Sequence, residues 1–172
     1  MEDFLRNLFA VENIGASSYF LVFLIAFLES IALIGGLVPG GTVVILAGFL
    51  AGQGYLSFFK LLLVAVPGAV LGDIFSFYLG DKNKDSKLFK GESRFIKKGA
   101  IEKGIAFFDR HGNKSIVIGR LIGFMRPVVP FVAGAMLMKK RSFILWCITS
   151  SFIWAILHLS FGYLFGAVFF GD

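Results

Sequence analysis

The sequence predicts an all-α integral membrane protein, built as an inverted repeat of a re-entrant helical hairpin followed by a transmembrane helix, with amphipathic surface helices. Two observations lead to this fold class. Of the 172 residues, 57% are hydrophobic and 16% aromatic, and the mean hydropathy is +0.83, which excludes an ordinary soluble domain. The apolar segments are separated by polar ones, and two of them are interrupted by proline and glycine. We expect a single domain over residues 1–172.

The first element expected is a short helix on the membrane surface over residues 1–14. Apolar side chains at positions 1, 4, 5, 8 and 9 share one helical face, and polar side chains lie opposite. The apolar run is too short for a signal peptide.

Residues 17–54 form the first expected re-entrant hairpin. Glu29 is the only charged residue in this stretch. As one helix it would measure about 55 Å, well beyond a hydrocarbon core of roughly 30 Å, so the chain must turn. The turn is expected at Gly35–Gly41, which contains Pro39 and Gly40. Two thin spans are the alternative.

A plain transmembrane span follows over residues 57–80 and carries Asp73 well inside it. The next segment, 81–114, holds ten Lys/Arg and five Asp/Glu, a net charge of +5. Its latter part predicts a basic amphipathic helix that ends at Gly112. Such a block next to membrane spans indicates the cytoplasmic side and contact with anionic headgroups, not nucleic acid.

Residues 115–138 form the second expected re-entrant hairpin. Arg120 and Arg126 lie in an apolar stretch, and Pro127 and Pro130 interrupt it. Arginine at bilayer depth normally faces protein or a water-filled cavity, and broken backbone is tolerated only in the same places. Basic residues flank the stretch on both sides, so a hairpin keeps both clusters on one side of the membrane. The final span is expected over 142–170.

The same pattern, an interrupted hairpin followed by a plain span, is therefore predicted in each half of the chain. One span lies between the two hairpins. Two interrupted apolar segments at matching places in two halves are typical of inverted-repeat transporters, whose site lies near the midplane.

Four pieces of the sequence occur in order between about Glu29 and Gly166: GGLVPGGTVVILAGFLAGQG, GAVLGDIFSFYLGDK, HGNKSIVIGRLIGFMRPVVPFVAGAMLM and FGYLFG. In these pieces the chain resembles the DedA family, also called the SNARE-associated or VTT-domain family. The resemblance covers most of the chain. Its most specific piece comprises Gly119, Arg120, Arg126, Pro127, Pro130 and Gly134. It implies two facing re-entrant hairpins and translocation of lipids such as undecaprenyl phosphate or phosphatidylethanolamine, often with a proton gradient.

Carried over by position, Arg120 and Arg126 match the arginines of the second hairpin, and Glu29 matches the acid before the first turn. Many members carry a carboxylate just after the Pro-Gly of the first hairpin, where this chain has Gly41. If that acid belongs to a proton relay, the resemblance implies that this chain lacks it. Asp73 is then the other acid at membrane depth that could share the role.

The residues themselves favour the same kind of site. A guanidinium matches phosphate oxygens in a bidentate fork and stays charged at any depth. Arg120 and Arg126 on a broken hairpin could therefore hold a lipid phosphate, with Glu29 exchanging partners or protons. The alternative is that Glu29 and Asp73 simply neutralise the two arginines as static buried pairs.

The predicted function is a flippase-like or scramblase-like translocase of a phosphate-bearing lipid. Its partners are phosphate-headgroup lipids and, if transport is coupled, protons; we expect no cofactor, metal, catalytic residue or nucleic acid. An enzyme is not expected, because no lipid-phosphatase motif and no Ser/His/Asp arrangement at membrane depth is present. A proton-coupled exporter of small cations, using Glu29 and Asp73, is the runner-up, and a scaffold without transport is a third hypothesis.

Several further residues are expected to serve structure. We expect His158 to be a hydrogen-bonded interior residue rather than a proton carrier, Trp154 to pack, and Cys147 to be a buried apolar side chain. The expected location is the bacterial or archaeal plasma membrane, as a multi-pass protein. The oligomeric state stays open, and a homodimer is compatible with the sequence.

Overall fold

The computed structural model describes residues 11–31, 40–83, 99–122 and 125–170. Within these ranges the regular structure is helical. The helices are α2 (Val11–Glu29), α3 (Gly40–Gly52), α4 (Phe58–Lys82), α5 (Ala100–His111), the 3₁₀ turn η1 (Gly112–Lys114), α6 (Ser115–Leu121), α7 (Val128–Ala135) and α8 (Lys140–Phe170).

Two of the described helices, α4 and α8, are long and apolar enough to cross a membrane. They contain 25 and 31 residues, and at 1.5 Å per residue they measure about 37 and 46 Å. The second predicted hairpin consists instead of α6 and α7, with 7 and 8 residues. Each of these is about 10–12 Å long, so neither crosses a hydrocarbon core of roughly 30 Å alone.

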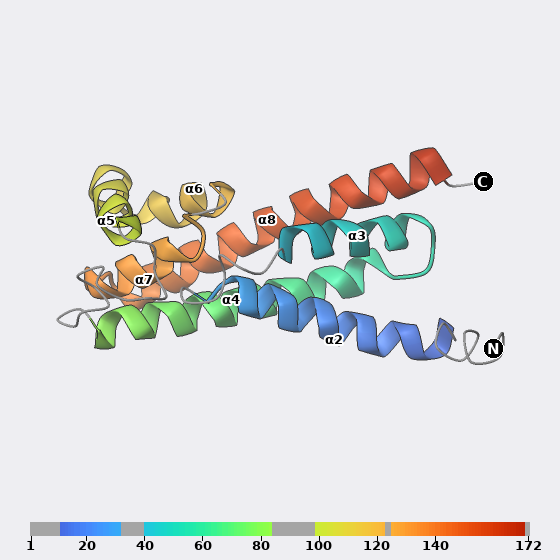
Figure 1. Ribbon diagram of the computed structural model, residues 1–172, viewed down its shortest axis with the longest axis horizontal. Coiled ribbons are helices and arrows are strands. Elements are labelled where there is room, and N and C mark those ends of the chain that lie inside the picture. Colours follow the sequence, from blue (N-terminus) through green and yellow to red (C-terminus); the bar gives the residue numbers. More distant parts are fainter. Residues whose placement is uncertain (1–10, 32–39, 84–98, 123–124, 171–172) are drawn as a thin grey trace.

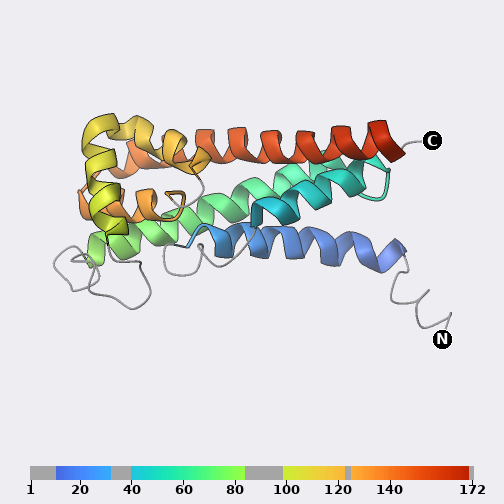
Figure 2. The ribbon, with the colours of Figure 1, turned by 45° about the horizontal axis from the view of Figure 1, so that its top comes forward.

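The two hairpins enter the bundle from opposite ends. In Figure 1, α2 and α3 lie in the half that holds both termini, and their adjoining ends point toward the middle of the molecule. The helices α6 and α7 lie in the other half, and their adjoining ends also face the middle. Figure 2 shows the same arrangement, with α4 and α8 running the full length beside both hairpins. That the hairpins re-enter one face of a bilayer stays a prediction.

The two halves of the molecule, α2–α4 and α6–α8, make equivalent helix contacts. The second arm of each hairpin packs on the long helix of the other half, α3 on α8 and α7 on α4. The first arm packs on the long helix of its own half, α2 on α4 and α6 on α8. Together with the opposite entry of the hairpins, this pattern agrees with the predicted inverted repeat.

Glycines bring these helices into backbone contact at equivalent places. A Cβ added to Gly48 in α3 would overlap the backbone of Leu159 in α8, and one on Gly162 would overlap Ile45 in α3. In the other half, Gly134 in α7 and Gly80 in α4 approach each other's helix backbone in the same way. Small residues of this kind allow membrane helices to pack closely. Inside a bilayer the hydrophobic effect does not drive helices together, so close van der Waals packing stabilises their contact.

The distribution of side chains is inverted relative to a soluble protein. Asp73, Arg120 and Arg126 are buried, whereas many large apolar side chains on the long helices are exposed. The exposed set includes Phe59, Leu63 and Leu71 of α4 and Leu145, Leu157, Phe161 and Leu164 of α8. An apolar exterior around buried charges is the arrangement that a bilayer favours.

The element boundaries differ from the prediction in one respect. Helix α2 begins at Val11, so residues 11–14 belong to the first arm of the hairpin and not to a separate surface helix. Residues 1–10 of that predicted helix, the turn with Pro39, and residues 84–98 lie outside the described residues. The helix expected before Gly112 is present as α5.

The glycine packing yields a prediction on stability. Gly48→Leu should push α3 away from α8, because the added side chain meets backbone that cannot rotate aside. Overpacking of this kind costs about 1–3 kcal/mol, so thermal unfolding in detergent should shift to lower temperature. Leu46→Phe is the matched control, since it enlarges an exposed side chain of the same helix. Equal unfolding temperatures for both variants would contradict the packing described here.

Candidate functional site: two buried ion pairs between the hairpin tips

The candidate site lies where the tips of the two hairpins meet, in the middle of the bundle (Figure 1). Glu29 is the last residue of α2, and Gly40 and Gly41 begin α3. Arg126 belongs to the connection between α6 and α7. Trp154, near the midpoint of α8, faces the same place.

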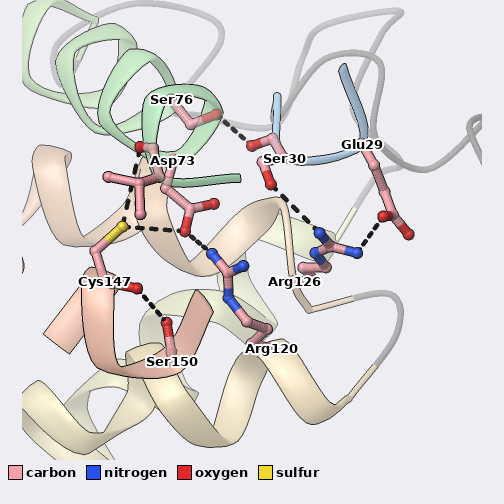
Figure 3. Close-up of polar contacts among 9 residues, drawn as sticks. Glu29, Ser30, Asp73, Ser76, Arg120, Arg126, Cys147 and Ser150 are labelled. Atoms are coloured by element: carbon pink, nitrogen blue, oxygen red, sulfur yellow. Dashed lines mark hydrogen bonds and ion pairs between the residues drawn. The ribbon is translucent and has the colours of Figure 1, made fainter. Parts of the chain in front are cut away.

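Arg126 forms an ion pair with Glu29, which joins the second hairpin to the first (Figure 3). Its guanidinium carbon lies 3.9 Å from the ring centroid of Trp154, a cation–π contact. Its Nη2 also donates to the hydroxyl of Ser30 at 3.5 Å. The Arg126 side chain is buried, whereas 14% of the Glu29 side chain is exposed. This pair is therefore more accessible than the Arg120–Asp73 pair that lies deeper in the bundle.

The start of α3 is shaped around Glu29. The backbone N–H of Gly41 donates to Glu29 Oε1 at 3.1 Å, and the first N–H groups of a helix carry partial positive charge that suits a carboxylate. A Cβ on Gly40 would overlap the same carboxylate, so a larger residue there would displace the Glu29 side chain. A Cβ on Gly41 would lie 3.2 Å from the imidazole of His158.

Arg120 forms a second ion pair, with Asp73, deeper in the bundle (Figure 3). Both side chains are almost fully buried. The thiol of Cys147 donates to Asp73 Oδ2 at 3.3 Å, so this carboxylate links α4, α6 and α8. Because leaving either charge unpaired here would be costly, the pair holds the second hairpin against the two long helices.

Ser30 connects the two pairs. Its backbone carbonyl accepts a hydrogen bond from Ser76 in α4 at 2.8 Å, and its hydroxyl accepts one from Arg126. Ser76 lies one helical turn after Asp73. The four charged groups thus lie in one region of the apolar bundle, with Ser30 and Ser76 between the two pairs (Figure 3).

The two guanidinium groups keep unshared hydrogen-bond donors. Arg126 Nε and Arg120 Nη1 are buried, and neither has a hydrogen-bond acceptor among the described residues. Buried polar groups are nearly always satisfied, so an unsatisfied buried donor calls for an explanation such as a bound water or ligand. Both donors belong to arginines, which can bind a phosphate through charge-assisted hydrogen bonds.

The prolines of the second hairpin start a helix rather than interrupt one. Pro127 directly precedes α7, and Pro130 lies in its first turn. The first four N–H groups of a helix have no intrahelical acceptor, so a residue without an N–H costs little there. Gly134 then brings α7 against the backbone of α4. Pro39 falls outside the described residues.

The structure thus brings together all four charged residues predicted for the site, two by two. It adds residues that were expected only to pack or to be hydrogen-bonded in the interior. Trp154 contacts Arg126, Cys147 contacts Asp73, and His158 lies beside Gly41, the position at which a family carboxylate was expected to be missing. In the sequence, the only indication of this was the i, i+4 spacing of Trp154 and His158, which places both side chains on one face of the same helix. No group of three or more potential metal ligands occurs in the described part of the chain.

Comparison with known proteins identifies the family. The VTT domain matches residues 38–164, which is most of the chain. The chain belongs to the DedA (VTT-domain) family. It is 35% identical to the inner membrane protein YabI of Escherichia coli over 146 residues, covering 85% of this chain and 57% of YabI. It is 33% identical to an uncharacterized membrane protein of Buchnera aphidicola over 139 residues, covering 80% of this chain and 53% of that protein.

The Escherichia coli protein DedA is 26% identical over 160 residues, which cover 92% of this chain and 73% of DedA. This DedA-family chain therefore spans about half to three quarters of the length of these relatives. No solved structure matches it. The Buchnera aphidicola relative is named a membrane protein, and YabI is named an inner membrane protein. The long apolar helices α4 and α8 agree with a membrane protein.

The unequal burial of the two pairs yields a prediction. Asp73→Asn leaves Arg120 charged, buried and unpaired, so stability should fall by about 3–5 kcal/mol. Glu29→Gln should cost less, because Glu29 is partly exposed and Arg126 keeps its contact with Trp154. Thermal unfolding in detergent measures both. The double change Asp73→Asn, Arg120→Gln should recover part of the loss; equal losses for the two single variants would contradict the ranking.

Proposed function

We propose that this protein moves a phosphate-bearing lipid, such as undecaprenyl phosphate or a phospholipid, between the two leaflets of a membrane. It acts as a multi-pass protein of the plasma membrane and without catalytic residues. The observation that supports this most is the Arg126–Glu29 pair, whose arginine keeps a buried, unshared donor at the meeting point of two oppositely entering hairpins.

The two arginines of the site favour an anionic ligand. Guanidinium groups bind phosphate through parallel charge-assisted hydrogen bonds. With both pairs formed, the two arginines and two acids sum to zero, so a phosphate must take the place of a carboxylate on one arginine. Glu29 is the more exposed acid, and a single ion pair at the rim of two hairpin tips can open without unpacking a long helix.

The midpoint location supports movement between leaflets. The site lies beside the middle of α4 and α8, the two helices long enough to span a membrane. A phosphate held there is at the depth where a lipid headgroup meets its largest energetic barrier, since an uncompensated charge in hydrocarbon is costly. The arginine charge lowers that barrier while the lipid tails stay in the bilayer.

The cation exporter is less well supported by these contacts. It requires free carboxylates, yet Glu29 and Asp73 are each paired with an arginine. A small cation would have to displace a tethered guanidinium from a buried site. The experiment below separates the two hypotheses by the sign of the substrate.

Lipid movement in liposomes tests the proposal. Arg126→Ala should slow the movement of labelled polyprenyl phosphate at least about tenfold, since a hydrogen bond to a charged group contributes roughly 1.5–3 kcal/mol. A labelled phospholipid and a labelled neutral lipid are followed in parallel. Arg141→Ala is the matched control, because it removes an exposed arginine at the start of α8.

A double variant separates transport from a static pair. Arg126→Gln with Glu29→Gln removes both charges and leaves no buried unpaired ion. If the pair only stabilises the fold, this variant regains wild-type activity. If Arg126 binds phosphate, the variant folds but stays inactive. Wild-type rates in a folded Arg126→Ala protein would overturn the site assignment.

A further inference from the structure

Glu29 requires a second partner if Arg126 leaves it for a phosphate, and this inference rests on the proposed function. An anionic Glu29 next to an incoming phosphate would place two negative charges in one largely dry site. The cost is removed only if a proton or a cationic side chain reaches Glu29.

His158 is the group that meets this requirement. Its Nδ1 lies 2.9 Å from the backbone oxygen of Trp154. A carbonyl oxygen only accepts hydrogen bonds, so Nδ1 carries the hydrogen and Nε2 keeps the free lone pair. The hydrogen bond thus leaves Nε2 as the nitrogen that takes up a proton.

The free nitrogen faces Glu29 across Gly41. The point at which a Cβ would stand on Gly41 lies 3.2 Å from His158 Nε2 and 3.9 Å from Glu29 Oε1. Both groups therefore border the same small space, which Gly41 leaves unfilled because it has no side chain. A direct contact between the two groups requires a side-chain movement, and a bridging water molecule would be the alternative.

A series of contacts also leads from Glu29 to His158. Glu29 pairs with Arg126, Arg126 lies over Trp154, and the Trp154 ring centroid is 4.8 Å from that of His158. Glu29 from α2 and Arg126 from the second hairpin are charged groups close to the His158 ring. A nearby carboxylate favours an imidazolium, and a nearby guanidinium opposes it. Removal of Arg126 to a phosphate therefore shifts the balance toward a protonated His158.

We propose that His158 is the proton-exchanging residue of this site and the alternative partner of Glu29. When Arg126 binds the lipid phosphate, Nε2 takes one proton from water and the imidazolium pairs with Glu29. When the phosphate leaves, Arg126 returns to Glu29 and the proton is released. One proton is bound for each phosphate bound, and no covalent bond other than N–H is made or broken.

The pH dependence of lipid movement tests this role. Wild-type movement of labelled polyprenyl phosphate should rise severalfold as the pH falls through the range in which histidine titrates, about 5 to 8. His158→Gln should lose that rise, because an amide can still donate to the Trp154 carbonyl but cannot take up a proton.

His111→Gln is the matched control. His111 makes the same contacts as His158, an Nδ1 hydrogen bond of 2.9 Å to the carbonyl oxygen four residues earlier and a ring contact with that residue, but lies at the end of α5. Its variant should keep the wild-type profile. A wild-type profile in His158→Gln would overturn the proposal.

A second measurement does not depend on transport. Purified protein in weakly buffered detergent should take up protons when polyprenyl phosphate is added, and His158→Gln should take up measurably fewer at the same phosphate occupancy. Equal uptake by both proteins would overturn the role of His158 while leaving phosphate binding intact. Absence of phosphate binding in the wild type would instead overturn the proposed function.

Discussion

The ion pair between Arg126 and Glu29 links the two hairpins, and the proposed exchange with a lipid phosphate depends on it. It joins their tips in the middle of an apolar bundle, where an unpaired charge would be costly. Trp154 supports the guanidinium from α8, and the N-terminus of α3 supports the carboxylate through Gly41. The deeper Arg120–Asp73 pair fixes the second hairpin to α4 and α8. One pair thus anchors the hairpin, and the other lies where exchange with a ligand disturbs the packing least.

Close helix packing makes these central charges compatible with a membrane. Each hairpin lays its second arm on the long helix of the other half, and glycines on both sides bring the backbones into contact. Neither hairpin can then move without sliding along a full-length helix. The inverted repeat also explains why the tips meet, since two equivalent hairpins that enter from opposite ends reach the same middle depth (Figure 2).

Much of this architecture was predictable from the sequence, because a bilayer restricts what an apolar chain with buried charges can do. Segment length and hydropathy indicated the two long helices, and prolines beside arginines indicated a break at Arg126–Pro130. The four charged residues of the site were recognisable as the charges at membrane depth. Pairing of the two acids with the two arginines was one hypothesis, but which acid meets which arginine was not predictable, since the partners come from different segments of the chain. Trp154, Cys147 and His158 were expected to be packing or interior residues because their types usually are; only the tertiary contacts reveal their polar neighbours.

The most direct measurement follows the Arg126–Trp154 contact during phosphate binding. The chain has two tryptophans, so Trp146→Phe leaves Trp154 as the single indole reporter. A guanidinium stacked on the ring perturbs its fluorescence, and departure of Arg126 to a phosphate should change the emission. Titration with polyprenyl phosphate should therefore produce a saturable change that a neutral lipid of equal chain length does not produce. An unchanged emission at saturating phosphate lipid, in protein that still moves this lipid, would contradict the claim that Arg126 exchanges Glu29 for phosphate.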